Sequence, residues 1–194
     1  MLKNIVFDIG GVILDDSNEV LEKFLNKSEN EVKNLSKMVY GNPNWKKCLL
    51  GEISQEEHLQ KLIEQFPAYQ QDFEKMLMPE YQEFVLPVMK ENLEVLYELK
   101  SKKYAIYFLS NLTEATYHYI KHTLDDFDGG IYSWQGHFVK PQQEIYELIL
   151  RKYHLKKEET IFFDDKLKNV QMGNQLGITS VQFRGREDVL RNIN

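Results

Sequence analysis

The pattern of apolar and polar residues divides the chain into two parts. At the N-terminus and again after residue 102, short apolar runs that end in polar residues predict buried strands rather than amphipathic helices. We expect such strands at residues 3–9, 104–110, 130–134, 160–165 and 178–183. Helical patterns separate them, at residues 87–102, 113–124, 141–153 and 167–176. This alternation indicates an α/β fold, a parallel sheet with helices on both faces.

Local signals predict where several of these helices begin and end. Pro87 and Pro141 suit the first turn of a helix, and Thr113 suits an N-cap. Gly177 is placed as the glycine that commonly follows a helix.

The segment from Ser17 to Glu83 has helical periodicity and almost no strand signal. Two capping boxes, which begin at Ser28 and Ser54, each precede apolar residues at helical spacing. We therefore expect about four helices, inserted after the first strand. The predicted division is a core of residues 1–16 and 86–194 and a helical cap of residues 17–85. Such an insertion would lie over the carboxyl ends of the strands, where open α/β sheets bind ligands.

Composition excludes several classes of protein. The 194 residues are 42% apolar, which is enough to bury a core. The 30 acidic residues outnumber the 24 basic ones, and the net charge of −6 argues against binding nucleic acid or an anionic membrane. Asp8 interrupts the first apolar run, unlike in a signal peptide, and the single cysteine, Cys48, fits a reducing compartment. We expect a cytoplasmic protein, a monomer or weak dimer, that binds neither nucleic acid nor membrane.

Polar residues that can carry chemistry stand at the ends of predicted strands and before a predicted helix: Asp8, Ser110-Asn111, Lys140 and Asp164-Asp165. A carboxylate at the end of a buried strand can attack phosphorus. Paired carboxylates are the oxygen ligands that Mg²⁺ prefers. A hydroxyl beside a helix N-terminus can hold phosphate oxygens, and a lysine can stabilise the charge of the transition state. Together these residues predict a phosphoryl-transfer site.

The same residues lie in four motifs, Asp8-Ile9-Gly10-Gly11-Val12, Ser110-Asn111, Lys140-Pro141 and Asp164-Asp165. In this order they resemble the motifs of the haloacid dehalogenase superfamily, and the resemblance extends over essentially the whole chain. It implies a Rossmann-like parallel sheet core with an inserted helical cap subdomain. Stretches such as FDIGGVI and KPQQEIYELIL are most similar to the branch that contains bacterial α-D-glucose-1-phosphate phosphatases.

The resemblance implies a role for each matching residue. Asp8 would attack phosphorus to form an aspartyl phosphate, and its other oxygen would bind Mg²⁺. Gly10 would offer its backbone carbonyl to the metal, Asp164 would bind the metal directly, and Asp165 would bind it through water or orient the groups around it. Lys140 would join the phosphoryl group to Asp8 as a catalytic cation.

Further residues would bind the substrate. Ser110 and Asn111 would donate hydrogen bonds to the phosphoryl group, and the bare backbone at Gly10 and Gly11 would let the phosphate come close. Asn169 could steady water ligands of the metal. Trp45, in the cap, could stack on a sugar face or simply belong to the core of the cap.

Gly10 is a departure from the pattern of most phosphatases of that superfamily. They have a second aspartate at this position, which serves as the general acid and base. The loss of a general acid typically costs about 10²–10⁴ in rate. A water, a substrate hydroxyl, Asp15, Asp16 or a cap residue could replace it. The anomeric oxygen of a sugar 1-phosphate needs less protonation on leaving, so the glycine favours such a substrate.

The sequence thus predicts a Mg²⁺-dependent phosphomonoester hydrolase acting on a small phosphorylated metabolite, such as a hexose 1-phosphate. One alternative is a 2-haloacid dehalogenase, which uses the same aspartate nucleophile, although Asp164 and Asp165 argue against it because displacing halide needs no metal. A second alternative is a protein that binds a phosphometabolite or a partner and has lost turnover. The retention of Asp8 and Lys140 argues against that alternative.

Overall fold

Five parallel strands form the sheet at the centre of the core, in the computed structural model, which describes residues 1–193. They are β1 (Asn4–Phe7), β2 (Ala105–Ser110), β3 (Gly129–Tyr132), β4 (Thr160–Asp164) and β5 (Thr179–Gln182). The order is β3-β2-β1-β4-β5, so β1 pairs with β2 on one side and with β4 on the other. The carboxyl end of β1 therefore lies where the strand order reverses, the usual ligand site of such sheets. The predicted fold class is confirmed.

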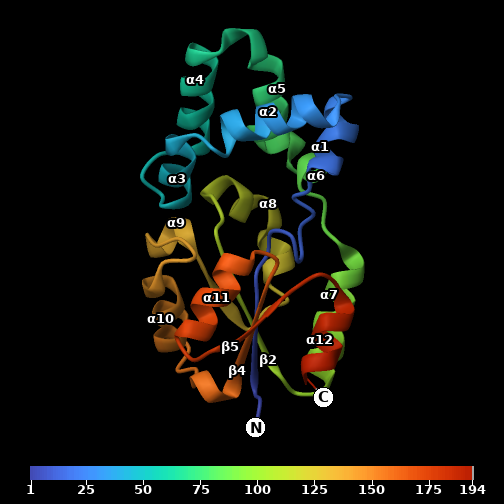
Figure 1. The fold of residues 1–194 in the computed structure, drawn as a ribbon, viewed down its shortest axis with the longest axis vertical. Helices are drawn as coiled ribbons and strands as arrows, with labels where there is room; N and C mark the ends of the chain where they lie inside the picture. The colour runs from blue at the N-terminus through green and yellow to red at the C-terminus, as the bar shows by residue number, and fades with distance from the viewer. Residues whose placement is uncertain (194) are drawn as a thin grey trace.

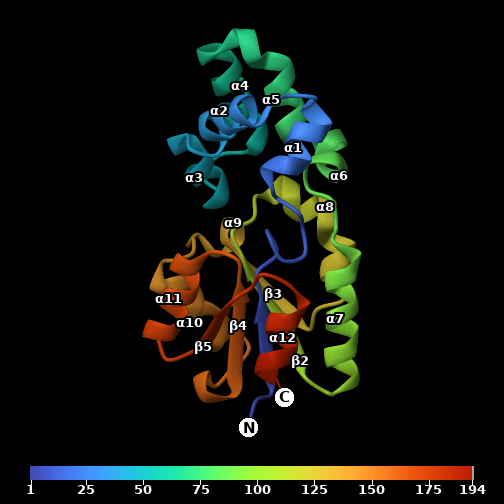
Figure 2. The same cartoon turned by 45° about the vertical axis from the view of Figure 1, so that its right-hand side comes forward.

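Helices cover both faces of this sheet (Figures 1 and 2). One face, with Ile5 and Phe7, packs against α7 (Lys90–Ser101), α8 (Glu114–Leu124) and α12 (Arg186–Ile193). The other, with Val6, packs against α10 (Gln143–Lys152) and α11 (Leu167–Gln175). Because neighbouring residues of a strand point to opposite faces, an unbroken apolar run supplies both layers of the core.

The cap stands above the carboxyl ends of the strands as a separate layer of helices, while both chain termini lie at the far end of the core (Figure 1). Between residues 17 and 86 the structure has α1 (Asn18–Leu25), α2 (Glu29–Val39), α3 (Pro43–Leu49), α4 (Gln55–Gln65), α5 (Gln70–Leu77) and α6 (Gln82–Val85). This is more than the four expected, since 3₁₀ turns at Pro67–Tyr69 and Pro79–Tyr81 interrupt the helical pattern. The cap has its own apolar cluster, which includes Val32, Leu62 and Phe73. The exact division at residues 16–17 and 85–86 stays a prediction.

Three predicted helix starts have the expected hydrogen bonds. The backbone N–H of Ser28 donates to Glu31 Oε2 at 2.9 Å. Ser54 Oγ accepts from the N–H of Glu57 at 3.0 Å, and the Thr113 hydroxyl accepts from the N–H of Thr116. Side-chain oxygens of Glu31, Ser54 and Thr113 thus accept from N–H groups that have no partner within the helix.

Neither Pro87 nor Pro141 lies in a first helical turn, so both predictions were wrong. Pro87 belongs to an extended segment that pairs with residues 13–15, since its carbonyl accepts from the N–H of Asp15 at 3.0 Å. This pairing delays α7 to Lys90. Residues 139–142 form a turn instead of a helix, in which Gln142 Oε1 accepts from the N–H of Val139 at 2.7 Å.

The short helices α9 (Ser133–Gly136) and α12 were not predicted, and α9 replaces the end of the strand expected at 130–134. In α12 a charged sequence hides the periodicity, and Val189 is its fully buried residue. Within residues 1–193, no helix has the length and apolar character needed to cross a bilayer. Cellular location and oligomeric state stay predictions.

Candidate active site

Asp8 lies directly after β1 and is only 4% exposed. Its backbone N–H donates to the carbonyl of Phe163 at 2.8 Å and so continues the ladder to β4. Its Oδ1 accepts from the Ser110 hydroxyl and from the N–H of Ile9, both at 2.6 Å. Its Oδ2 lies 2.8 Å from Lys140 Nζ. The carboxylate thus has contacts from the end of β2, from the N–H of the next residue and from the Lys140 turn.

Lys140 is the buried cation of the site. Its ammonium lies 2.6 Å from Asp164 Oδ2 as well as 2.8 Å from Asp8 Oδ2, and its side chain is 1% exposed. Burial opposes ionisation of Asp8, but the charges of Lys140 and Lys166, together with hydrogen bonds from Lys140 and Ser110, outweigh it and hold the pKa of Asp8 below its usual range. Asp8 is therefore ionised, as a nucleophile must be.

Asp164 and Asp165 end β4 and begin the loop to α11. Burial and the charge of Asp8 raise the pKa of Asp164 to about 6, against the opposing effect of Lys140. Asn169 Nδ2 donates to both oxygens of Asp164, at 2.9 and 3.0 Å, and the N–H of Lys166 donates to Oδ1 at 2.8 Å. These donors fix the orientation of the Asp164 carboxylate. Burial also raises the pKa of Asp165.

This group of carboxylates fits a hard divalent cation. Asp8, Asp164 and Asp165 each offer an oxygen, and these atoms lie within 4.8 Å of one another. Among residues 1–193, buried Asp165 Oδ1 and Asn169 Oδ1 have no hydrogen-bond partner. Oxygen donors alone and a net negative charge are typical of a Mg²⁺ site. Unpartnered buried oxygens are costly, so they favour a cation that would use them directly or through water.

The loop after Asp8 needs glycine at position 11. Gly11 has φ +72°, and a Cβ atom built there would lie 2.6 Å from the Asp165 side chain. The positive φ and the close approach of Asp165 each make any other residue at this position costly. The N–H of Gly11 donates to the carbonyl of Leu14 at 2.8 Å, which closes the turn.

Asn111 uses its side chain on the Lys140 backbone. Its Nδ2 donates to the Lys140 carbonyl at 3.1 Å, and its Oδ1 accepts from the Lys140 N–H at 2.8 Å. The predicted hydrogen bond from Asn111 to the phosphoryl group stays a prediction, while its side-chain amide pairs with the Lys140 backbone. Ser110, by contrast, points its hydroxyl at Asp8. The two neighbouring residues thus orient the two proposed catalytic side chains.

A cavity of about 420 Å³ opens between the core and the cap. Gly10, Asn111 and Asn169 are on its core side. Its cap side is mostly apolar, with Leu21, Tyr40, Trp45, Leu49, Met76, Leu77 and Val85. Trp45 packs edge-on against Tyr40, with ring centroids 5.0 Å apart. Trp45 is therefore both a residue of the cap core and part of the cavity wall. A place in the cap core and the predicted stacking on a sugar are thus compatible.

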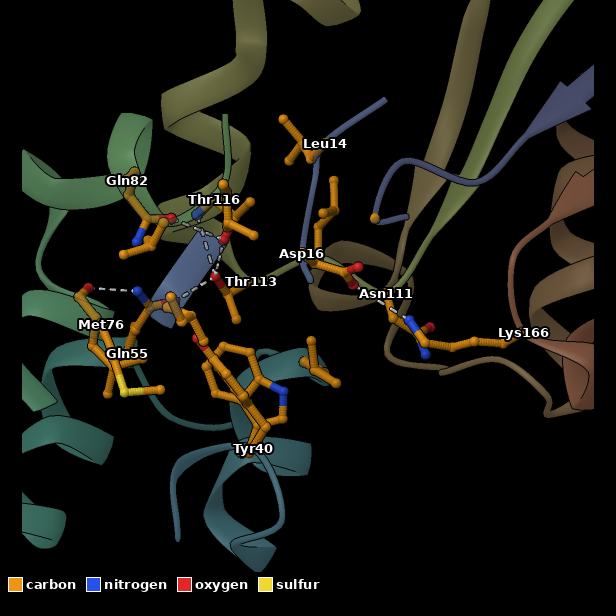
Figure 3. Close-up of a pocket in the computed structure, with 18 of the residues that line it drawn as sticks. Leu14, Asp16, Tyr40, Gln55, Met76, Gln82, Asn111, Thr113, Thr116 and Lys166 are labelled. Carbon is orange, nitrogen blue, oxygen red and sulfur yellow. Dashed lines mark hydrogen bonds and ion pairs between the residues drawn. The ribbon is translucent and has the colours of Figure 1, made fainter. Parts of the chain in front are cut away.

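Buried amides and hydroxyls join the cap to the core beside this cavity (Figure 3). Gln55 Nε2 donates to the Leu77 carbonyl at 2.6 Å, within the cap. Gln55 Oε1 accepts from the hydroxyl of Thr113 at 2.7 Å, across the boundary. A second pair, Thr116 and Gln82, lies 3.5 Å apart. Sequence reasoning missed both glutamines, because polar residues in a helix carry no signal of burial.

Asp16 and Lys166 approach each other across the cavity from the two sides of the site (Figure 3). Lys166 Nζ lies 3.5 Å from Asp16 Oδ2 and 3.8 Å from Asp165 Oδ1. Burial disfavours the charge of Lys166, but the carboxylates of Asp16, Asp8, Asp165 and Asp164 together outweigh it and raise the pKa of this lysine. Burial also raises the pKa of Asp16, against the effect of Lys166. Lys166 was not among the predicted site residues.

The structure brings most predicted residues to one end of the sheet, but their roles stay predictions. Direct contacts join Asp8, Ser110, Lys140 and Asp164, and Asp165 lies within the same carboxylate group. Trp45 stands on the opposite, cap side of the cavity.

Comparison with known proteins gives a consistent result. Residues 2–177 match the family described as haloacid dehalogenase-like hydrolase. Over 196 residues the chain is 26% identical to D-ribitol-5-phosphate phosphatase of Bacteroides thetaiotaomicron. The alignment covers 94% of this chain and 92% of that protein. It is also 33% identical to a sesquiterpene phosphatase of Aspergillus oryzae, over 45% of this chain and 46% of that protein.

Solved structures agree on the fold. A family enzyme of Bacteroides thetaiotaomicron, crystallised in complex with magnesium and inorganic phosphate, superimposes with a TM-score of 0.78. The alignment covers both chains completely at 20% identity.

Proposed function

This chain belongs to the haloacid dehalogenase-like hydrolases, and from that premise we propose that it is a Mg²⁺-dependent phosphomonoesterase that acts through an aspartyl phosphate. The observation that carries the proposal is the position of Lys140. Its buried ammonium bridges Asp8 and Asp164 at 2.8 and 2.6 Å, at the carboxyl end of the sheet. A nucleophile, a fixed cation and a metal-binding carboxylate thus meet in one place, as phosphoryl transfer requires.

In the proposed reaction, Asp8 attacks phosphorus and the bond from phosphorus to the ester oxygen breaks. Ser110 and the Ile9 N–H hold Oδ1 of Asp8. Lys140 holds Oδ2 and places positive charge where the phosphoryl oxygens gain negative charge. Water then attacks the aspartyl phosphate, inorganic phosphate leaves, and Asp8 is regenerated.

Asp8, Asp164 and Asp165, with the carbonyl of Gly10, are the groups we assign to the metal. A bound Mg²⁺ would neutralise and orient the phosphoryl oxygens. The dehalogenase alternative gives this carboxylate group no task, because halide displacement from carbon generates no phosphoryl charge to neutralise.

The substrate we propose is a single phosphate ester of a small, uncharged, hydroxyl-bearing molecule, such as a hexose 1-phosphate. Among the described residues that line the cavity from the cap, none is a lysine or arginine. The two lysines that line the cavity, Lys166 and Lys168, belong to the core. The cap itself therefore offers no partner for a second anionic group. It offers instead the indole of Trp45 and the amides of Gln55 and Gln82, which suit the faces and hydroxyls of a sugar or polyol. The name of the ribitol-phosphate relative agrees with this class.

The test is phosphate release from a panel of sugar 1-phosphates, sugar 6-phosphates, polyol phosphates and p-nitrophenyl phosphate, with Mg²⁺ or EDTA. We expect release that needs Mg²⁺ and that disappears in Asp8→Asn. Release that persists in EDTA or in Asp8→Asn would contradict the mechanism. A folded protein that binds Mg²⁺ but releases no phosphate would favour the binding-protein alternative. A preference for doubly charged substrates would contradict the substrate class.

A further inference from the structure

The space beside Gly10 is occupied by a carboxylate from elsewhere in the chain. A Cβ atom built on Gly10 would lie 3.1 Å from Oδ2 of Asp16 and 3.8 Å from its carboxyl carbon. A side chain at position 10 would therefore grow directly toward the place where the Asp16 carboxylate now stands. The site lacks an acid at position 10 in sequence but has one close to that position in space.

The fold of the loop explains this placement. The carbonyl of Ile9 accepts from the N–H groups of Ile13 and Leu14, at 2.8 and 2.9 Å. Gly11 and Leu14 add a further bond, and the Asp15 N–H is held by the Pro87 carbonyl at 3.0 Å. The chain thus folds back on itself, so that Asp16 returns to Gly10, six residues earlier in the sequence. The loop is pinned by backbone bonds at several points.

The Asp16 side chain faces the cavity rather than the protein interior. It is 39% exposed and lines the same cavity as Gly10 and Asn111 (Figure 3). Its one charged partner is Lys166 at 3.5 Å, among the described residues. Half-exposed pairs at such a distance contribute little to stability. The pair with Lys166 therefore orients the Asp16 carboxylate without being needed for the stability of the fold.

We propose that Asp16 is the general acid and base of this enzyme. The inference rests on the proposed phosphomonoesterase function. As Asp8 attacks, the carboxylic acid of Asp16 gives its proton to the departing ester oxygen, which leaves as an alcohol. The resulting Asp16 carboxylate then takes a proton from the water that attacks the aspartyl phosphate. Phosphate leaves, and Asp8 and the protonated Asp16 are restored.

If Asp16 is the general acid, the glycine at position 10 no longer restricts the substrate to sugar 1-phosphates. If Asp16 protonates the leaving oxygen, the enzyme does not require the acidic anomeric oxygen of a sugar 1-phosphate. Esters of ordinary alcohols, such as sugar 6-phosphates and terminal polyol phosphates, then become good substrates as well. The substrate class widens from 1-phosphates to alkyl monophosphates of the same size.

The first test compares leaving groups in Asp16→Asn. A general acid matters for an alkyl oxygen and hardly at all for p-nitrophenolate, which leaves without a proton. We expect kcat/KM for a sugar 6-phosphate to fall about 10²–10⁴-fold and that for p-nitrophenyl phosphate to fall far less. Equal losses on both substrates, or no loss, would overturn the proposal.

Asp15→Asn is the matched control. Asp15 is the neighbouring acid on the same loop, and its Oδ1 accepts from the N–H of Ser17 at 3.0 Å. An asparagine keeps this acceptor and removes the same charge. We expect no change in the dependence on leaving group. A dependence like that of Asp16→Asn would overturn the assignment to Asp16.

A second test moves the acid back to position 10. In the wild-type background, Gly10→Asp places two carboxylates in one space, so we expect lower activity. In the Asp16→Ala background the space is free, and the same substitution should restore turnover of the sugar 6-phosphate. Equal effects of Gly10→Asp in both backgrounds would overturn the proposal.

Intact-mass measurement separates this proposal from the function on which it rests. With p-nitrophenyl phosphate, Asp16→Asn should complete the first step and then lose its base for the second. We expect a burst of p-nitrophenolate and a protein that carries one added phosphoryl group. If the wild-type protein turns over substrate but this variant shows no burst and no adduct, the role of Asp16 as general acid and base is overturned, while the proposed phosphatase activity stands. If the wild-type protein cleaves no monoester, both fail.

Discussion

Asn111 and Lys140 are joined by two reciprocal hydrogen bonds, in which the side-chain amide of Asn111 pairs with both backbone groups of Lys140, at 2.8 and 3.1 Å. This pair ties the loop after β2 to the turn that carries the buried ammonium. The side chain of Asn111 thus positions Lys140, whatever the rest of the residue contributes to binding phosphate.

We expect Asn111→Ala to lower kcat at least about tenfold and the free energy of unfolding by about 1–2 kcal/mol. The physical reason is that Lys140 loses the backbone contacts that hold its ammonium against Asp8. Steady-state kinetics and urea denaturation measure the two effects.

Asn174 offers a matched control, because it forms the same kind of reciprocal pair with the backbone of Ser180, both bonds at 3.0 Å. Asn174→Ala should lose a similar free energy of unfolding and keep its kcat. If both variants lose stability and neither loses activity, Asn111 has no positioning role.

Lys140→Met should destabilise the metal-free protein by about 3–5 kcal/mol, because it leaves the carboxylates of Asp8 and Asp164 buried without their cation. Mg²⁺ should restore part of this loss, since a bound cation supplies the missing charge. Chemical denaturation with EDTA and with Mg²⁺ measures both quantities. A variant that Mg²⁺ stabilises no more than the wild-type protein would argue against a metal at these carboxylates.

His58 makes the stability of the cap depend on pH. It is completely buried, its Nε2 lies 3.1 Å from the Val39 carbonyl, and burial lowers its pKa below the ordinary value of 6.5. The folded cap therefore keeps the imidazole neutral while the unfolded chain protonates it. Because the unfolded state then binds more protons, the free energy of unfolding should fall as pH drops below about 6.5, by at most about 1.4 kcal/mol per pH unit.

The fluorescence of Trp45 can report the unfolding of the cap near His58, since the two ring centroids lie 5.8 Å apart. In a Trp134→Phe background, the remaining indole fluorescence follows unfolding of the cap. His58→Gln should lose less stability than its parent between pH 7 and pH 5.5, by the contribution of His58, while Asp164, with its pKa of about 6, titrates in both proteins. An unchanged pH dependence in that variant would assign the effect to other groups.

Gln55 should govern substrate affinity through the contact between cap and core. Gln55→Ala removes its bonds to Leu77 and Thr113 and should raise KM about tenfold, the effect of about 1.4 kcal/mol. We expect kcat to change less, because none of the described hydrogen bonds of Gln55 involves Asp8. The control is Gln60→Ala, an exposed glutamine of the same helix. A fall in kcat with unchanged KM would contradict this role.

Sequence reasoning found the strands and the residues at their ends because both signals are local. A buried parallel strand must be apolar on both faces, so runs such as residues 161–163 are visible without a structure. Asp8, Ser110 and Asp164 follow such runs directly. Parallel strands bring their carboxyl ends to one edge, which made the meeting of these residues predictable. The helix starts at Pro87 and Pro141 were not predictable, because contacts from distant residues decide them.

The sequence by itself determined the fold class, the family motifs and the residue types at the strand ends. Only the tertiary structure decided that Asp16 fills the space beside Gly10, that Asn111 holds Lys140 and that Gln55 crosses from cap to core. The physical reason is the range of each effect. Hydrophobic periodicity depends on neighbours along the chain. The place of Asp16 depends instead on the pairing of residues 13–15 with residues 87–89, and Asn111 and Gln55 depend on side-chain hydrogen bonds to partners far away in sequence.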